Sequence, residues 1–219
     1  MSVAQKIGWA IAAALLALVL YAADGYRDAL RDAPRLKTLA NVIIEDGRGP
    51  DSLEPWQLEA YLQVEDPAFF DHSGVDLSSP GGGATTISQS LAKRLAFKDF
   101  RRGIGRIRQT AYAIALENEL DKTEILALAL DLAPMGPKDG QWITGVHTAS
   151  QAFFASPVAD LDRRDYLSLI AVMIAPGDLR VSAPDLALER RVARIDRLIR
   201  GECVPTSNSD IWLNGCSGS

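Results

Sequence analysis

The N-terminal segment from Ile7 to Ala23 contains no charged residue. In a helix these 17 residues extend roughly 25 Å, at about 1.5 Å per residue, against a bilayer core of roughly 30 Å. Trp9 and Tyr21 stand near the two ends, where amphipathic rings favour a membrane interface. The run has no polar face, which is not typical of a helix on a soluble protein surface. We therefore expect residues 1–24 to form a single membrane anchor.

Two alternatives to an anchor stay open for this run. A cleaved signal peptide has a similar apolar core, and residues 20–23 offer small side chains, although without a clean small-x-small cleavage site. A buried helix of a soluble protein is the second alternative. Basic residues also follow the run, so the positive-inside rule does not orient it, but long translocated domains obey that rule poorly. We expect the body of the chain to be exported.

Composition limits what the body can be. With 47% hydrophobic and 23% charged residues among 219, the chain has enough apolar surface for one folded domain, which excludes disorder as its main state. Two histidines and two cysteines exclude zinc chemistry and a disulfide-dense fold. Cys203 and Cys216 either close a loop in an oxidising compartment or stay free thiols. The net charge of -5 argues against a nucleic-acid partner.

Hydrophobic spacing predicts a mainly α fold without internal repeats or strands of useful length. Residues 25–54 are charged and turn-rich and are expected to form a stalk or linker. Residues 55–200 are expected to form the domain, and 201–219 a C-terminal tail. Asp121 to Glu124 resembles a capping box at a helix start. The helix-compatible segments are 55–64, 86–97, 106–120, 121–132, 146–154, 166–175 and 184–199.

The segment 65–76 contains four carboxylates, one imidazole and two aromatic rings in 12 residues. A solvated acidic loop is one interpretation. The functional interpretation is a carboxylate beside apolar surface, whose pKa is raised by desolvation so that it works as a general base. A metal site of Asp71, His72 and Asp76 is disfavoured, because their spacing matches no specific ligand pattern.

A glycine-rich turn and a basic cluster follow this segment. Glycines 81–83 precede a predicted helix start, where backbone amides bind anions, although a flexible linker has the same composition. Residues 91–110 contain seven basic residues and one acidic residue, Asp99, which gives this stretch a local charge of +6. Solvated helix faces usually mix signs, so we expect this cluster to bind phosphate or pyrophosphate. Behind a membrane anchor, that phosphate would belong to a lipid, with anionic headgroups as the less specific ligand.

These features together resemble glycosyltransferase family 51, the peptidoglycan transglycosylases. The family's first motif is Glu-Asp-x-x-Phe-x-x-His-x-Gly-x-Asp. This chain matches it at Glu65, Asp66, Phe69, His72, Gly74 and Asp76. Residues 85–93 resemble its second motif, with Ser90 where the family has a second glutamine, and further segments match in order up to about residue 200.

The resemblance implies a lysozyme-like fold and polymerisation of lipid II into β-1,4 glycan strands with release of undecaprenyl pyrophosphate. By resemblance, Glu65 is the catalytic general base. The residues implied in substrate binding are Thr85, Gln89, Lys93, Arg101 and Arg106. The sequence requires no cofactor, but the family often uses a divalent cation, Mg or Mn, at the pyrophosphate.

The resemblance also implies a location and partners. We expect a single-pass protein of the bacterial inner (cytoplasmic) membrane, with its catalytic domain facing the periplasm. Lipid II, nascent glycan and the membrane are the implied partners, together with other cell-wall synthases.

The chain departs from the family pattern in three places. Gln109 stands where the family has its second catalytic carboxylate, and it can neither hold a charge nor pass a proton. The connection 77–80 is short, and residues 129–131 read Ala-Leu-Asp instead of Tyr-Leu-Asn. Three functions stay open: a divergent peptidoglycan glycosyltransferase, which we favour, a catalytically impaired member acting as a binding or scaffold protein in cell-wall synthesis, and a single-Glu glycan-cleaving enzyme.

Overall fold

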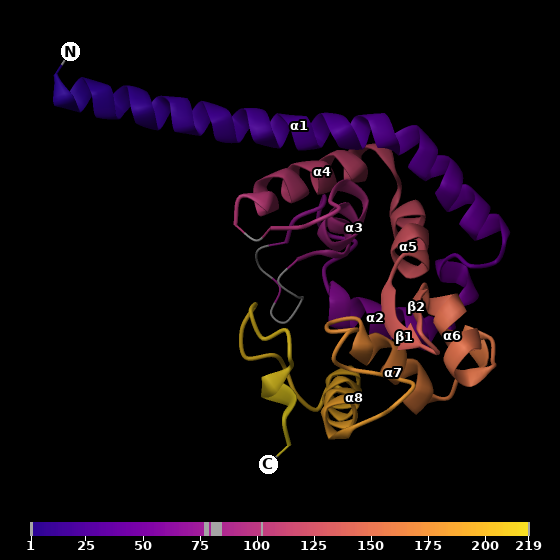
Figure 1. Ribbon diagram of the computed structural model, residues 1–219. Coiled ribbons are helices and arrows are strands. Elements are labelled where there is room, and N and C mark those ends of the chain that lie inside the picture. Colours follow the sequence, from indigo (N-terminus) through magenta and orange to yellow (C-terminus); the bar gives the residue numbers. More distant parts are fainter. Residues whose placement is uncertain (1, 77–78, 80–84, 102, 219) are drawn as a thin grey trace.

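The computed structural model describes residues 2–76, 79, 85–101 and 103–218 (Figure 1). Within these residues the chain forms eight α-helices and a two-stranded hairpin, which confirms the predicted mainly α class. The helices after the first are α2 (Pro55–Glu65), α3 (Ile87–Ala96), α4 (Gly105–Glu119), α5 (Lys122–Asp131), α6 (Val146–Phe154), α7 (Arg163–Val172) and α8 (Leu186–Ile199). All seven lie within a few residues of the predicted segments. Three short 3-10 turns complete the fold, η1 (Pro50–Ser52), η2 (Val158–Asp160) and η3 (Asn214–Cys216).

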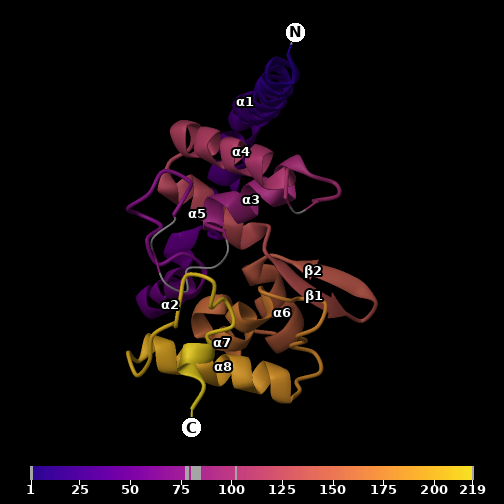
Figure 2. The ribbon, with the colours of Figure 1, turned by 90° about the vertical axis from the view of Figure 1, so that its left-hand side faces the viewer.

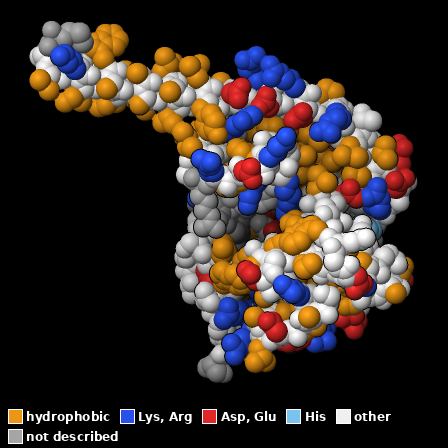
Figure 3. Space-filling view, viewed as in Figure 1, with side chains coloured by type: hydrophobic (Ala, Val, Ile, Leu, Met, Phe, Trp, Pro, Cys, Tyr) orange, Lys and Arg blue, Asp and Glu red, His pale blue; other side chains and the backbone are white. Residues whose placement is uncertain are grey.

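Helix α1 runs without interruption from Val3 to Glu45. Its N-terminal half projects from the body (Figure 1) and carries apolar side chains along its length (Figure 3). This half is long and apolar enough to cross a membrane, and its most apolar window is 0% buried. The alternative of a buried core helix is therefore wrong.

The second half of α1 belongs to the body of the protein. Our expectation of a turn-rich stalk is wrong for residues 25–45, because small and apolar residues recur there every three or four positions and form one buried stripe. The stripe consists of Gly25, Ala29, Ala33, Leu36, Ala40 and Ile43. It packs against α4 and α5. Pro34 lacks an amide hydrogen, which allows α1 to bend over these helices (Figure 1).

Helix caps explain where the helices begin. Thr86 accepts from the amide of Gln89 at the start of α3, and Asp121 accepts from the amide of Glu124 at the start of α5, which confirms the predicted capping box.

Strands β1 (Pro134–Lys138) and β2 (Gln141–Thr144) form an antiparallel hairpin that we did not predict, since its glycine and prolines suggested a loop. Asp139 and Gly140 both have positive φ, the backbone of a tight two-residue hairpin turn.

The body has two layers (Figure 2). Helices α3 and α4 pack on each other and on α1, and α5 completes this upper layer. Helices α2, α6, α7 and α8 form the lower layer together with the hairpin, and the C-terminal tail passes in front of α8 in the view of Figure 2. Cys203 and Cys216 form a disulfide that closes this tail into a loop. A cavity of about 580 Å³ opens between the layers.

Candidate active site

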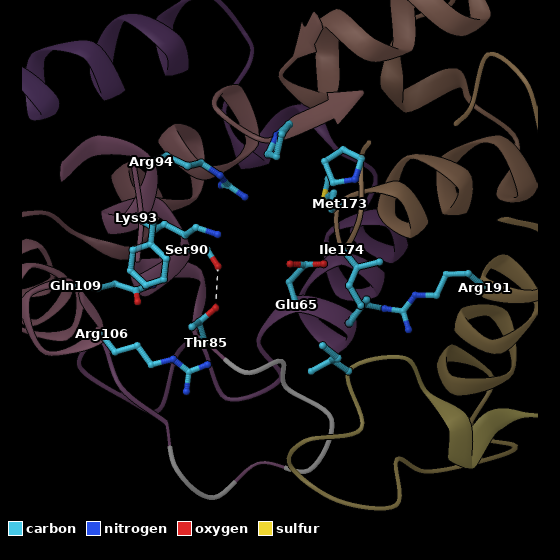
Figure 4. Close-up of a pocket in the computed structure, with 15 residues that line it drawn as sticks. Glu65, Thr85, Ser90, Lys93, Arg94, Arg106, Gln109, Met173, Ile174 and Arg191 are labelled. Carbon is cyan, nitrogen blue, oxygen red and sulfur yellow. Dashed lines mark hydrogen bonds between the residues drawn. The ribbon is translucent and has the colours of Figure 1, made fainter. Parts of the chain in front are cut away.

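Glu65, the last residue of α2, stands between the two walls of this cavity (Figure 4). Burial raises the pKa of its carboxyl group, and Asp66 adds to this effect. Arg94 from α3 and Arg191 from α8 oppose it by favouring the carboxylate. Glu65 therefore holds its proton more tightly than a glutamate in water does, while Arg94 and Arg191 stabilise its carboxylate when it ionises.

The wall formed by α3 and α4 is cationic. Lys93 and Arg94 come from the last turns of α3, and Arg106 comes from the first turn of α4. The ammonium of Lys93 lies 5.2 Å from the ring centre of Phe100, a cation–π contact that holds its chain against the wall. Burial lowers the pKa of Arg94, whereas Tyr61 and Glu65 favour its charged form. This wall is suited to an anionic ligand.

Five of the seven predicted site residues line the cavity. They are Glu65, Thr85, Lys93, Arg106 and Gln109. Gln89 is not among them, because its side chain is engaged within the upper layer: its oxygen accepts from the amide of Thr86 at 3.1 Å, and its nitrogen donates to Thr110 Oγ1 at 3.0 Å. Arg101 is exposed and also lies outside the lining.

Two charged residues of the lining, Arg94 and Arg191, were not predicted from the sequence as site residues. Arg94 was visible only as one member of a basic cluster. Arg191 carried a clearer signal, because it lies between Leu188 and Ile195 on the face of α8 that is otherwise apolar. A charged residue on a buried helix face usually has a partner or a ligand. That observation would have found it.

Gln109 is buried in the upper layer, and its amide nitrogen donates to the backbone oxygen of Gln89 at 2.8 Å. Glu117 does not supply an acid to the cavity, because it accepts from the hydroxyl of Ser88 and forms an ion pair of 2.7 Å with Lys122. Among the cavity-lining residues that the structure describes, Glu65 is thus the only carboxylate.

The rest of the acidic motif holds the end of α2 against the start of α3. Both oxygens of Asp66 lie 3.0 Å from His72 Nε2, and one accepts from the amide of Ile87 at 2.9 Å. His72 Nδ1 accepts from the amide of Gly74, so in the neutral ring Nε2 carries the proton. Thr86 donates to the backbone oxygen of Gly74 at 2.8 Å. These bonds place Glu65 relative to the cationic wall.

The donor set of the cavity does not fit a protein-held divalent cation. Such cations need several oxygen ligands, most often carboxylates. This lining offers one carboxylate beside Lys93, Arg94, Arg106 and Arg191, whose charges repel a metal ion. The described part of the chain contains no group of three metal-binding side chains.

Three parts of the predicted site region lie outside the described residues: the glycine-rich turn 81–83, most of the connection 77–80, and Arg102.

A protein-family model described as transglycosylase matches residues 49–199. The chain belongs to the transglycosylase family. A biosynthetic peptidoglycan transglycosylase of Citrobacter koseri is 31% identical over 183 residues, which cover 76% of this chain and 74% of that protein. One from Escherichia coli O81 is 32% identical over 160 residues, covering 67% of this chain and 64% of the relative. These findings confirm the resemblance to the peptidoglycan transglycosylases and the lysozyme-like, mainly α fold expected from it.

Proposed function

We propose that this protein is a peptidoglycan glycosyltransferase that polymerises lipid II into β-1,4 glycan strands and releases undecaprenyl pyrophosphate. One observation carries the proposal: Glu65, a carboxylate whose pKa is raised, faces a wall of cations across a cavity. Glycosyl transfer needs a base at the acceptor and positive charge where the leaving group becomes anionic. The names of the family and of its relatives support the same reaction class.

In this reaction Glu65 removes the proton from the 4-hydroxyl of the acceptor sugar. The hydroxyl oxygen forms a bond to the anomeric carbon of the donor, and the bond between that carbon and the pyrophosphate breaks. Lys93 and Arg106, with Arg94 nearby, stabilise the negative charge that the pyrophosphate gains. A base with a raised pKa suits this step, because proton transfer is most effective when the pKa lies near the working pH.

Gln109 does not prevent this chemistry. A pyrophosphate leaves as an anion, so cations stabilise it without an acid that protonates it. Gln109 lies beside the cationic wall and leaves all of its positive charge available. The second carboxylate that the resemblance places at this position is therefore dispensable for the bond-breaking step.

We further propose a single-pass protein of the inner membrane, with the body facing the periplasm. The apolar half of α1 supplies the span. Because the same helix continues into the body and packs on α4, the span and the cationic wall belong to one packed unit. A lipid-linked substrate, nascent glycan and other cell-wall synthases are the partners that this arrangement suits.

Polymerisation of lipid II by the purified full-length chain tests the proposal, with and without added Mg²⁺ or Mn²⁺. We expect glycan strands from the wild type and none from Glu65→Gln. Glu59→Gln is the matched control, since Glu59 lies on the same helix and is exposed. A wild type that makes no polymer under either condition contradicts the proposal.

A binding protein is the second candidate, favoured because the described lining of the cavity contains one carboxylate. A non-catalytic member would bind lipid II without polymerising it, and Glu65→Gln would leave the affinity unchanged. Measuring lipid II binding and polymer in parallel separates the two functions. Polymer made by the wild type removes the binding-only function.

A further inference from the structure

The C-terminal tail reaches the active-site cavity, although it follows the segment that matches the transglycosylase family. Ile211 lines the cavity, and the ring of the next residue, Trp212, lies 5.9 Å from the guanidinium carbon of Arg191. That separation is within the range of a cation–π contact. The tail is therefore part of the wall that holds Arg191 opposite the α3 cations.

The tail has a defined structure that hydrogen bonds and a disulfide hold together. Asp210 is buried and accepts hydrogen bonds from the amides of Thr206, Asn214 and Gly215 at 2.7–3.1 Å. Although burial alone would raise the pKa of Asp210, these hydrogen bonds lower it. The disulfide joins the two legs of the loop. Together these contacts fix the position of Trp212.

Helix α8 binds the loop through two further arginines. Arg194 donates to the backbone oxygen of Trp212 and to the side chain of Asn214, both at 3.0 Å, and Arg197 donates to the backbone oxygen of Cys216 at 3.4 Å. These bonds tie the loop to the same helix that carries Arg191.

Arg191 needs such support, because only 4% of its surface is exposed and two of the three nitrogens of its guanidinium, Nε and Nη1, have no hydrogen-bond partner among the described residues. Burial lowers the pKa of Arg191 to about 10, while Glu65 and Asp210 favour its charged form. The ring of Trp212 is thus a direct neighbour that orients a guanidinium otherwise held by longer-range charge.

We propose that Trp212 is a positioning residue for glycosyl transfer: the disulfide-closed tail places its ring over Arg191 and keeps that guanidinium in the wall of the cavity that the base Glu65 also lines. This inference rests on the proposed function. The groups that act on Glu65 are Tyr61 on its own helix, Asp66, Arg94 from α3 and Arg191 from α8. Of the two cations, only Arg191 depends on the tail.

The expected consequence has a definite sign. Arg191 lowers the pKa of Glu65, so a displaced Arg191 leaves Glu65 protonated at a higher pH, where it is not a base. Trp212→Ala should therefore move the acid limb of the kcat/KM profile to higher pH. On that limb we expect a loss of about two- to fivefold, the range for a partly exposed cation–π contact. The loss should shrink at high pH, where Glu65 is ionised in both proteins.

The experiment compares wild type, Trp212→Ala, Trp212→Phe and the double variant Cys203→Ser/Cys216→Ser. Trp142→Ala is the matched control, because this exposed ring lies on strand β2 and lines no part of the cavity. We expect rescue by Trp212→Phe, which keeps an aromatic face, and the same direction of change in the double variant as in Trp212→Ala.

A second readout does not depend on turnover. The carboxyl carbon of Glu65, labelled with ¹³C and assigned through Glu65→Gln, reports its titration by NMR in the full-length protein. The midpoint should rise in Trp212→Ala and stay unchanged in Trp142→Ala. A wild type without polymerase activity refutes the proposed function, while the titration still tests the role of Trp212. If Trp212→Ala lowers thermal stability but moves neither the midpoint nor the acid limb, the tail is only structural and the inference is wrong.

Discussion

Asp66→Asn tests whether the acidic motif acts mainly as a scaffold behind Glu65. In the wild type, the two carboxylate oxygens of Asp66 accept from the amide of Ile87 and from His72 Nε2, at 2.9–3.0 Å, and 1% of the residue is exposed. An asparagine has one oxygen and one NH₂ group. With its oxygen at the Oδ2 position an asparagine can still accept from both donors, but as a neutral acceptor, and its NH₂ group then lies at the Oδ1 position, 3.0 Å from the donor His72 Nε2.

The magnitude follows from these contacts. A hydrogen bond to a charged group contributes about 1.5–3 kcal/mol, against about 0.5–1.5 kcal/mol for a neutral one. Because two hydrogen bonds lose this difference and two donors come to face each other, we expect Asp66→Asn to lower the free energy of unfolding by about 2–4 kcal/mol. For a chain of this size that corresponds to a fall in Tm of about 4–16 °C.

Thermal unfolding of the full-length protein in detergent, followed by circular dichroism, measures this loss. Asp71→Asn is the control, because Asp71 belongs to the same segment but is exposed. Lipid II polymerisation should also fall in Asp66→Asn, since the link between α3 and the end of α2 that carries Glu65 is weakened. A loss of stability below about 1 kcal/mol, or equal losses in the two variants, would refute the scaffold role.

Three further predictions test other parts of the structure. Gly25→Leu should lower the free energy of unfolding by about 1–3 kcal/mol through overpacking, because a Cβ at Gly25 would lie 2.7 Å from the backbone oxygen of Arg108. Denaturant unfolding measures this loss. The control is Gly8→Leu, where a Cβ meets nothing within 4 Å, and an equal effect of that variant would argue against the prediction. Burial raises the pKa of Glu65, so wild-type stability is lost as the pH rises from the ordinary glutamate value through the raised one; Glu65→Gln lacks this loss, and its stability advantage in denaturant titrations should grow over that pH range. Lys93→Met and Arg106→Met should each weaken lipid II binding about 10- to 100-fold, as expected for a charged hydrogen bond of about 1.5–3 kcal/mol, whereas the exposed Lys98→Met should not.

The positions of the helices were predictable because local signals agreed with the packing. Asp121 caps α5 as its sequence suggests, and Asp162 caps α7 in the same way. The second half of α1 was missed because its charged residues dominate the composition of residues 25–45, while the buried stripe consists largely of Gly and Ala. Small residues carry little hydrophobic signal, yet they allow α1 and α4 to approach closely, as the contact between Gly25 and Arg108 shows.

The candidate site was predictable on one wall only. Glu65, Lys93 and Arg106 belong to motifs or clusters that are local in sequence, so their chemistry is visible without a fold. Arg191 reaches the cavity from α8, far along the chain, and Ile211 reaches it from the tail. Such residues enter a site through tertiary packing, which no local pattern encodes. Gln89 shows the converse, because it stands at a motif position but its side chain caps the start of α3 and does not line the cavity.

The neutral side chain of Gln109 affects the charge balance of the cavity and therefore its affinity for anions. Four cations and one carboxylate line the described cavity, and an acid at position 109 would offset one of those cations. The cavity of this protein should therefore bind pyrophosphate more tightly than a cavity with two carboxylates, and should release it more slowly. Gln109→Glu has two opposing effects: it weakens anion binding and it adds a second group that transfers protons. Because the new carboxylate would also face the backbone oxygen of Gln89, like partial charges favour its protonated form. We therefore expect Gln109→Glu to raise the Kd for inorganic pyrophosphate only at high pH, where the added group is ionised.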